Sequence, residues 1–290
     1  MANKPSVLLI GGPDAGKTNY LGRLWIAINS NTGLLRKDGL PDDLAYLEEV
    51  ANKLLQGRFA PHTPRGQHNS SFIPFTSAPE TGPAGGTLAV PDCFGEKWMD
   101  VCRKREWSNE WEELISEDCG CLVFLRVESE QIVPALDPIT CAGYALQGDA
   151  PVSAGSAIPT QVVLIEWLQF LRQAFTGRVR GSYRPRVGIV VTAWDLVPAD
   201  AQSELPSQYL SSNFPMLGQF LEANPAAFDF AYFGVSVVAG ELDPKKDPDF
   251  RQVYIDGNPR EAGYVVHSVG GVLQKSGDLT LPVAWALRIC

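Results

Sequence analysis

A phosphate-binding loop with a strand before it and a helix after it constrains this chain more than any other feature. The segment Gly11-Gly-Pro-Asp-Ala-Gly-Lys-Thr18 matches the pattern Gly-x-x-x-x-Gly-Lys-Thr. An apolar run over 7–10 precedes it, and a helical pattern over 17–29 follows it. The glycines let the backbone fold around a polyphosphate with its N–H groups pointing inward. A structural turn rich in glycine is the alternative, but such a turn does not require the flanking strand and helix.

The residues of this loop carry the groups that bind a nucleoside triphosphate. The Lys17 ammonium can reach the terminal phosphates, and the Thr18 hydroxyl can ligate Mg²⁺. The helix that follows adds positive potential at its N-terminus. The sequence therefore predicts a nucleotide site with contacts from Gly11, Asp14, Ala15, Gly16, Lys17, Thr18 and Asn19.

Composition limits the classes of partner that the chain can bind. The net charge of -9 over 290 residues argues against a general affinity for nucleic acid or for anionic membranes, because both need a basic face. No apolar run approaches the ~20 residues of a membrane-spanning helix. The fold begins within a few residues of the N-terminus, which leaves no room for a signal peptide. We expect a cytoplasmic protein with no membrane insertion.

The six cysteines do not form the pattern of a secreted disulfide framework. Cys119-Gly-Cys121 has the spacing of half a zinc site, but no second cysteine pair or nearby histidine completes the set. We therefore expect reduced, mostly buried thiols.

Apolar runs alternate with helical patterns along most of the chain, which predicts an α/β fold with a mostly parallel central sheet and helices on both faces. Together with the phosphate loop, this pattern resembles the P-loop NTPase architecture. One domain over 1–290 is expected, with an insertion at about 128–158 and a C-terminal extension at about 241–290. Strands are expected at 7–10, 71–75, 87–90, 121–127, 187–192 and 230–238, with the second and third forming a hairpin. Helices are expected at 17–29, 41–55, 98–115, 160–175 and 206–224. The segment 264–273 reads as a strand or a short helix, 281–287 as a small helix or a strand, and 241–249 as irregular.

Three further segments follow predicted strands, so they fall at the carboxyl ends where ligands bind in such sheets. The first is Leu88-Ala-Val-Pro-Asp92-Cys-Phe-Gly95. An aspartate at a strand end can hold the Mg²⁺ shell, and the Gly95 backbone N–H can reach a γ-phosphate. A simple turn is the alternative for this Asp-x-x-Gly segment, although its position after a phosphate loop favours function.

The second segment ends in Thr192-Ala-Trp-Asp195, and the third contains Ser236. A carboxylate at Asp195 can accept two hydrogen bonds from the N1–H and exocyclic amine of guanine, which adenine cannot offer. The segment resembles the guanine-recognition motif of GTPases, Asn/Thr-Lys-x-Asp, in which the stem of the lysine covers the base; Ala193 stands in place of that lysine. Trp194 either stacks on the base in its place or belongs to the core. Ser236 either begins a loop whose backbone contacts guanine or is a plain strand end.

In order and strand context, these four segments resemble the translation-factor-related class of P-loop GTPases over roughly residues 5–240. Within that class the chain looks closest to the bacterial double-GTPase families of conflict and defence loci. The shared details are the long gap between Thr18 and Asp92, the Glu96-x-Trp98 that follows the Asp-x-x-Gly, the broken stretch around Asp137 and the tail Pro282-Val-Ala-Trp285.

The resemblance implies further site residues. A switch threonine should meet Mg²⁺ and the γ-phosphate, and Thr63 is the candidate, with Thr76 as the alternative. Glu96 stands where Ras-like members often carry the glutamine that orients the attacking water, so slow hydrolysis is expected from its charge. Arg58 and Arg65 are candidates for a cis arginine finger, although solvated loop arginines are the simpler interpretation.

The sequence as a whole predicts a GTP- and Mg²⁺-dependent switch that hydrolyses GTP slowly. Its expected protein partner is a second GTPase, or an effector or activating protein. A binding or scaffold module with little turnover is one alternative, and a P-loop ATPase or kinase is the other.

Overall fold

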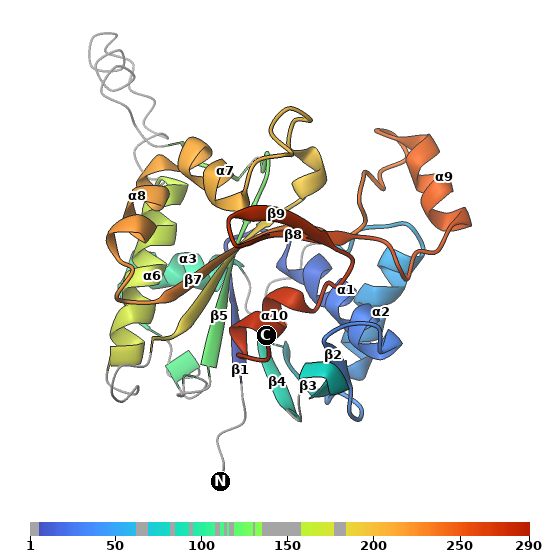
Figure 1. The fold of residues 1–290 in the computed structure, drawn as a ribbon, viewed down its shortest axis with the longest axis horizontal. Coiled ribbons are helices and arrows are strands. Elements are labelled where there is room, and N and C mark those ends of the chain that lie inside the picture. The colour runs from blue at the N-terminus through green and yellow to red at the C-terminus, as the bar shows by residue number, and fades with distance from the viewer. Residues whose placement is uncertain are drawn as a thin grey trace.

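The computed structural model of the chain describes residues 6–61, 69–81, 85–92, 95–107, 111–112, 115, 119–129, 131–134, 158–176 and 184–290. A six-stranded sheet in the order β1-β5-β6-β7-β8-β9 lies at its centre (Figure 1). The four parallel strands are β1 (Ser6–Ile10), β5 (Cys119–Arg126), β6 (Arg186–Thr192) and β7 (Asp229–Ser236). Two antiparallel strands complete it, β8 (Tyr264–Val269) and β9 (Val272–Ser276). The mostly parallel α/β sheet predicted from the sequence is confirmed.

The strand register determines which residues meet at the carboxyl edge of this sheet. Arg126 of β5 is paired with Thr192 of β6, and Thr192 is paired with Val235 of β7. All three positions come at or next to the end of their strand. The loops that follow these strands therefore leave the sheet side by side, close to the loop that follows β1.

A smaller antiparallel sheet lies beside β1. It has the order β2-β3-β4, with β4 against β1 (Figure 1). Its strands are β2 (Leu35–Lys37), β3 (Asn69–Ser77) and β4 (Gly85–Asp92). The hairpin predicted from 71–75 and 87–90 is thereby confirmed, with both strands longer than expected. β2 was not predicted, because three residues are too few for a periodic pattern.

Helices cover both faces of the main sheet (Figure 1). One face carries α3 (Gly95–Lys104), α6 (Thr160–Thr176), α7 (Pro206–Asn213) and α8 (Pro215–Ala223). The other carries α1 (Lys17–Ser30), α2 (Leu44–Leu55) and α10 (Leu281–Ala286). A further helix, α9 (Pro248–Asp256), lies next to α1 and α2 at the outside of the molecule.

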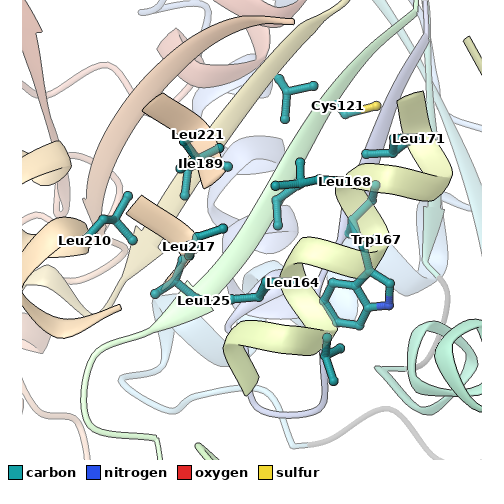
Figure 2. Close-up of a cluster of buried hydrophobic side chains, with 14 of the residues drawn as sticks. Cys121, Leu125, Leu164, Trp167, Leu168, Leu171, Ile189, Leu210, Leu217 and Leu221 are labelled. Atoms are coloured by element: carbon teal, nitrogen blue, oxygen red, sulfur yellow. The ribbon is translucent and has the colours of Figure 1, made fainter. Parts of the chain in front are cut away.

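The helix α6 shows how the sequence pattern becomes a core. Its apolar side chains recur at helical spacing and point at β5 and at the neighbouring helices (Figure 2). Leu164, Trp167, Leu168 and Leu171 are all buried. Each such side chain contributes about 1.5–3 kcal/mol when it leaves water. This packing fixes α6 against the sheet.

Two predicted helices differ from the structure at their ends. The helix expected over 98–115 begins at Gly95 and ends at Lys104, because Arg105 adopts a left-handed backbone with φ 57°. The helix expected from Pro41 begins at Leu44. Asp43 caps it by accepting a hydrogen bond from the Tyr46 N–H at 3.3 Å, so this aspartate lies before the first turn rather than in it.

The C-terminal half also departs from the prediction. The segment 206–224 forms two helices, because Pro215 cannot continue the first and instead begins the second. The helix α9 was missed next to a stretch that reads as irregular. The segment 264–273 becomes a hairpin, β8 and β9, and 281–287 becomes helix α10.

The insertion predicted at 128–158 lies mostly outside the described residues. The predicted division into one domain with an insertion and a C-terminal extension stays a prediction. Cys119 and Cys121 are buried in β5 as free thiols. Within the described ranges there is no group of three or more His, Cys, Asp or Glu that could hold a metal ion, and no helix is long and apolar enough to cross a lipid bilayer.

Candidate nucleotide-binding cleft

A cleft of about 730 Å³ opens at the carboxyl ends of the parallel strands. The loop after β1 and the segments that follow β6 and β7 line it. The loop after α2 and the end of β5 also contribute to the lining. Its lining residues that carry the argument below are Asp14, Lys17, Thr18, Arg126, Asp195 and Ser236.

The glycines of the phosphate loop are required by their surroundings. Gly16 has a left-handed φ of 86°, and a Cβ there would lie 2.7 Å from Thr192 Oγ1. A Cβ on Gly11 would lie 3.0 Å from Phe124 Cβ. Only glycine fits a backbone this close to its neighbours. The loop therefore keeps a concave path against the sheet, which suits a polyphosphate.

The Lys17 side chain lies inside this loop. Its Nζ donates to the carbonyl oxygens of Gly11 and Gly12 at 2.6 and 2.9 Å, and the residue is only 8% exposed. The ammonium is thus held at the centre of the turn before any phosphate arrives. Thr18 lies beside it in the first turn of α1 and lines the cleft.

Thr192 was predicted as a nucleotide contact, and the structure places its hydroxyl against the phosphate loop. Its Oγ1 donates to the Ala15 carbonyl oxygen at 2.9 Å and approaches the Leu125 carbonyl oxygen at 3.3 Å. The residue is buried at the end of β6. These bonds join the phosphate loop to β6, so in this structure Thr192 positions the loop.

Asn19, also predicted as a contact, likewise bonds to protein. Its Oδ1 accepts a hydrogen bond from the Ala60 N–H at 2.8 Å. This bond ties the start of α1 to the loop after α2.

Asp195 and Ser236 meet at the other end of the cleft. Asp195 is half-buried in the short turn that follows β6, and burial raises its pKa above the ordinary value. A hydrogen bond from Ser236 and the charge of Arg126 oppose this rise, while Glu241 adds to it. Ser236 is fully buried, and its Oγ also accepts from the Ala239 N–H at 2.8 Å. The carboxylate is therefore oriented by a buried hydroxyl that is itself held by a second hydrogen bond.

The structure decides the alternatives for Trp194. The indole is 1% exposed, lies edge-on to Tyr209 at 5.4 Å and contacts Gly234. It belongs to the core and cannot stack on a base in the cleft. The apolar residues that do line this end of the cleft are Leu196, Val237 and Val238. The sequence analysis missed them, since short apolar residues after a strand look like core.

The remaining predicted residues fall partly outside the described structure. Asp92 ends β4, and Gly95 and Glu96 begin α3. The structure describes only the backbone at these three positions. Thr63 and Arg65 are outside the described residues altogether. Among the described residues, Thr76 lies within β3 and Arg58 is exposed, and neither lines the cleft.

Arg126 is the main residue that the sequence analysis missed. It ends β5, lines the cleft and forms an ion pair with Asp14, with 2.8 Å between Nη1 and Oδ1. The available signal was a single cation near the end of an otherwise apolar strand. A charge at that position faces the ligand edge of the sheet.

A mostly parallel sheet with a lysine-bearing phosphate loop at its carboxyl edge, and a half-buried carboxylate in the same cleft, is the arrangement of a P-loop nucleotide-binding protein. A family model described as Double-GTPase 1 matches residues 8–286. The chain therefore belongs to the Double-GTPase 1 family, and it is a P-loop GTPase that binds guanine nucleotide.

The solved structures to which the chain is similar are remote in sequence. The signal recognition particle receptor SRb-GTP/SRX complex from Chaetomium thermophilum aligns with 15% identity and a TM-score of 0.40, over 87% of this chain and 98% of that one. Sup35 complexed with GDP aligns with 12% identity and a TM-score of 0.35, over 87% and 44%. A search of curated protein sequences found no match. The family membership rests on the family model.

Proposed function

We propose that this protein is a Mg²⁺-dependent guanine-nucleotide switch that hydrolyses GTP slowly. The observation that carries the proposal is that Lys17, Thr18 and Asp195 line one cleft although they lie far apart in the sequence. Lysine and threonine supply the phosphate and metal end, and aspartate supplies the base end. A GTP molecule needs both ends at once.

Asp195 would select guanine. Its ionised carboxylate accepts hydrogen bonds from the N1–H and the exocyclic amine of the base. Adenine lacks this pair of donors and would leave a half-buried carboxylate unpaired, which costs binding free energy. Leu196 and Val238 would cover the base in the absence of the usual lysine stem at Ala193.

Lys17 and the loop N–H groups would stabilise the charge that develops as water attacks the γ-phosphate. Mg²⁺, held by the Thr18 hydroxyl and by Asp92 through water, would neutralise part of the phosphate charge. Thr63 and Gly95 would order around GTP and relax with GDP, which is the basis of a switch. Glu96 would place a negative charge near the γ-phosphate, so hydrolysis without a partner would be slow.

The protein partner would be a second GTPase encoded in the same locus. The pair would act in the cytoplasm, as part of a bacterial conflict or defence system. The family description, Double-GTPase 1, supports pairing of this kind. An activating partner could supply an arginine in trans, as other GTPase partners do.

The test is isothermal titration of the nucleotide-stripped protein with non-hydrolysable GTP and ATP analogues in Mg²⁺, repeated on Asp195→Asn. We expect tight binding of the GTP analogue alone, weakened at least tenfold by the substitution, with xanthine nucleotide gaining affinity. Asp200→Asn, at an exposed aspartate beyond the cleft lining, is the matched control. Binding of the ATP analogue as tight as that of the GTP analogue, and independent of Asp195, would contradict the proposal and favour a P-loop ATPase or kinase.

A binding module with little turnover is the second candidate, and one observation favours it. Arg126 is the one arginine among the described residues that line the cleft, and its guanidinium is bonded to Asp14. No arginine of the described chain is therefore aimed at the phosphates. Single-turnover hydrolysis of radiolabelled GTP separates the two candidates, because only a GTPase releases phosphate faster than the nucleotide alone decays.

A further inference from the structure

The phosphate loop contains one acidic residue, Asp14, and both oxygens of its carboxylate are occupied by donors from another segment. Arg126 Nη1 donates to Oδ1 at 2.8 Å, and Ser129 Oγ donates to Oδ2 at 2.9 Å. The two donors are three residues apart, at the end of β5 and just beyond it. They hold the carboxylate from two sides.

The segment that carries these donors is itself held in place. The Val127 N–H donates to the Thr192 carbonyl oxygen at 3.0 Å, and the Gln131 N–H donates to Ser129 Oγ at 3.2 Å. Val133 and Thr160 exchange two hydrogen bonds of 2.9 Å, which tie the segment to the start of α6. The guanidinium and the hydroxyl are therefore presented to Asp14 by a fixed backbone.

Asp14 lies where its charge would affect the binding of a polyphosphate. The residue lines the cleft between Gly12 and Lys17, and its left-handed φ of 59° fits the turn that presents N–H groups to phosphate. An unpaired carboxylate there would repel the polyphosphate across a few ångströms. The repulsion would be stronger than in water, because Asp14 is only 23% exposed.

We propose that Arg126 is a positioning residue for nucleotide: it neutralises Asp14 and holds its carboxylate aside, which allows the loop to accept a polyphosphate. This inference rests on the guanine-nucleotide site proposed above. Arg126 acts through Asp14 and not by touching the phosphates. The alternative, in which Arg126 leaves Asp14 and binds the phosphates directly, predicts a different result for the double variant.

The test is a double-mutant cycle on nucleotide affinity. Binding of a fluorescent GDP analogue and of pyrophosphate is measured for wild type, Arg126→Ala, Asp14→Asn and the double variant. Arg126→Ala should weaken both ligands about tenfold, because it exposes the Asp14 charge. Asp14→Asn should tighten them a fewfold, because it leaves the Arg126 charge unbalanced. The double variant should return to within about threefold of wild type, since no net charge is left.

Two further variants exclude a merely structural effect. Arg126→Lys keeps a cation at the end of β5 and should bind within about threefold of wild type, which also keeps the test informative if the alanine variant unfolds. Arg184 lies just before β6, is exposed and donates to the Pro225 carbonyl oxygen. Arg184→Ala removes this arginine and should not change nucleotide binding. The unfolding temperature of each variant is recorded beside its affinity.

A double variant that stays as weak as Arg126→Ala would overturn the inference, because it would mean that Arg126 contacts the phosphates itself. Unchanged affinity in Arg126→Ala would overturn it as well, while leaving the proposed function intact. A wild-type protein that binds pyrophosphate but not GDP would refute the proposed function alone. Failure to bind either ligand would refute both.

Discussion

The carboxyl group of Asp195 is under opposing influences, and their balance matters for binding. Burial favours the neutral acid and raises its pKa above the ordinary 3.8, and Glu241 acts in the same direction. The Ser236 hydroxyl and Arg126 favour the carboxylate, but they do not cancel the effect of burial. Tyr264 lies near this group, and its own pKa is raised mainly by burial and further by the Asp195 charge. In the function proposed above, guanine binding needs the ionised form of Asp195.

Guanine-nucleotide affinity should therefore fall with acidity at a higher pH than an ordinary aspartate would cause. Below the raised pKa, a proton must leave Asp195 on binding, so Kd should rise about tenfold per pH unit. Titrations with GDP from pH 8 down to pH 4.5 measure this directly. Asp195→Asn should show a weaker but flatter profile, and equal profiles for both proteins would contradict the prediction.

The raised pKa of Asp195 affects the stability of the unliganded protein in the opposite direction to nucleotide affinity: a rise in pH strengthens binding but lowers this group's contribution to stability. The folded chain binds more protons than the unfolded chain between pH 3.8 and the raised value, so this group's contribution to stability falls as pH rises through that window. At neutral pH the burial of this carboxylate therefore lowers the stability of the unliganded fold, and Ser236 and Arg126 offset only part of that effect.

At the scale of elements, hydrogen bonds between buried side chains join the three helices α1, α2 and α9. Arg23 of α1 is almost fully buried, and its guanidinium donates to Tyr254 Oη at 2.8 Å and to the Pro259 carbonyl oxygen at 2.6 Å. The Tyr254 hydroxyl in turn donates to the Leu54 carbonyl oxygen at 3.0 Å. One phenol therefore joins three helices, including the helix that carries the phosphate loop.

Tyr254→Phe should lower the free energy of unfolding by about 2 kcal/mol, because it leaves the Leu54 carbonyl oxygen and a buried guanidinium without this partner. Urea denaturation followed by circular dichroism measures the change, with an unaltered m value. Much of the loss should return in the Arg23→Met/Tyr254→Phe variant, which replaces the stranded charge by an apolar side chain. A change below about 0.5 kcal/mol would show that the junction adds no net stability.

Elements differed in how well the sequence predicted them, for a physical reason. α6 has a long apolar stripe at helical spacing, and its bounds were predicted within one residue. α9 exposes most of its residues and is held mainly by Tyr254 and by Arg251, whose Nε donates to the Gly57 carbonyl oxygen at 2.9 Å. Such contacts with distant segments leave no periodic pattern, so the helix was missed.

At the scale of the whole molecule, the cleft exists only in the folded state. Its walls come from segments that follow β1, β6 and β7, more than 200 residues apart at the extremes. A ligand that touches all of them binds the native chain and not the unfolded one.

Guanine nucleotide should therefore stabilise the whole fold. At 100 times its Kd, GDP with Mg²⁺ should add about 2.7 kcal/mol, which corresponds to a rise in Tm of roughly 5–10 °C. Differential scanning calorimetry with GDP and with ADP measures the effect. Lys17→Ala should lose most of the rise with GDP. An equal rise in that variant, or with ADP, would place the ligand elsewhere.

The sequence by itself determined the fold class and the phosphate loop, and it predicted Asp195 as the residue that selects guanine. These predictions depend on local patterns: apolar strands, glycine spacing and a carboxylate at a strand end. Only the tertiary structure decided that Thr192 bonds the loop carbonyl at Ala15, that Trp194 belongs to the core and that Arg126 pairs with Asp14. Each of these contacts joins residues that lie far apart in the chain. The direction of a side chain at a strand end depends on which strands pair and in what register, and no local pattern encodes that.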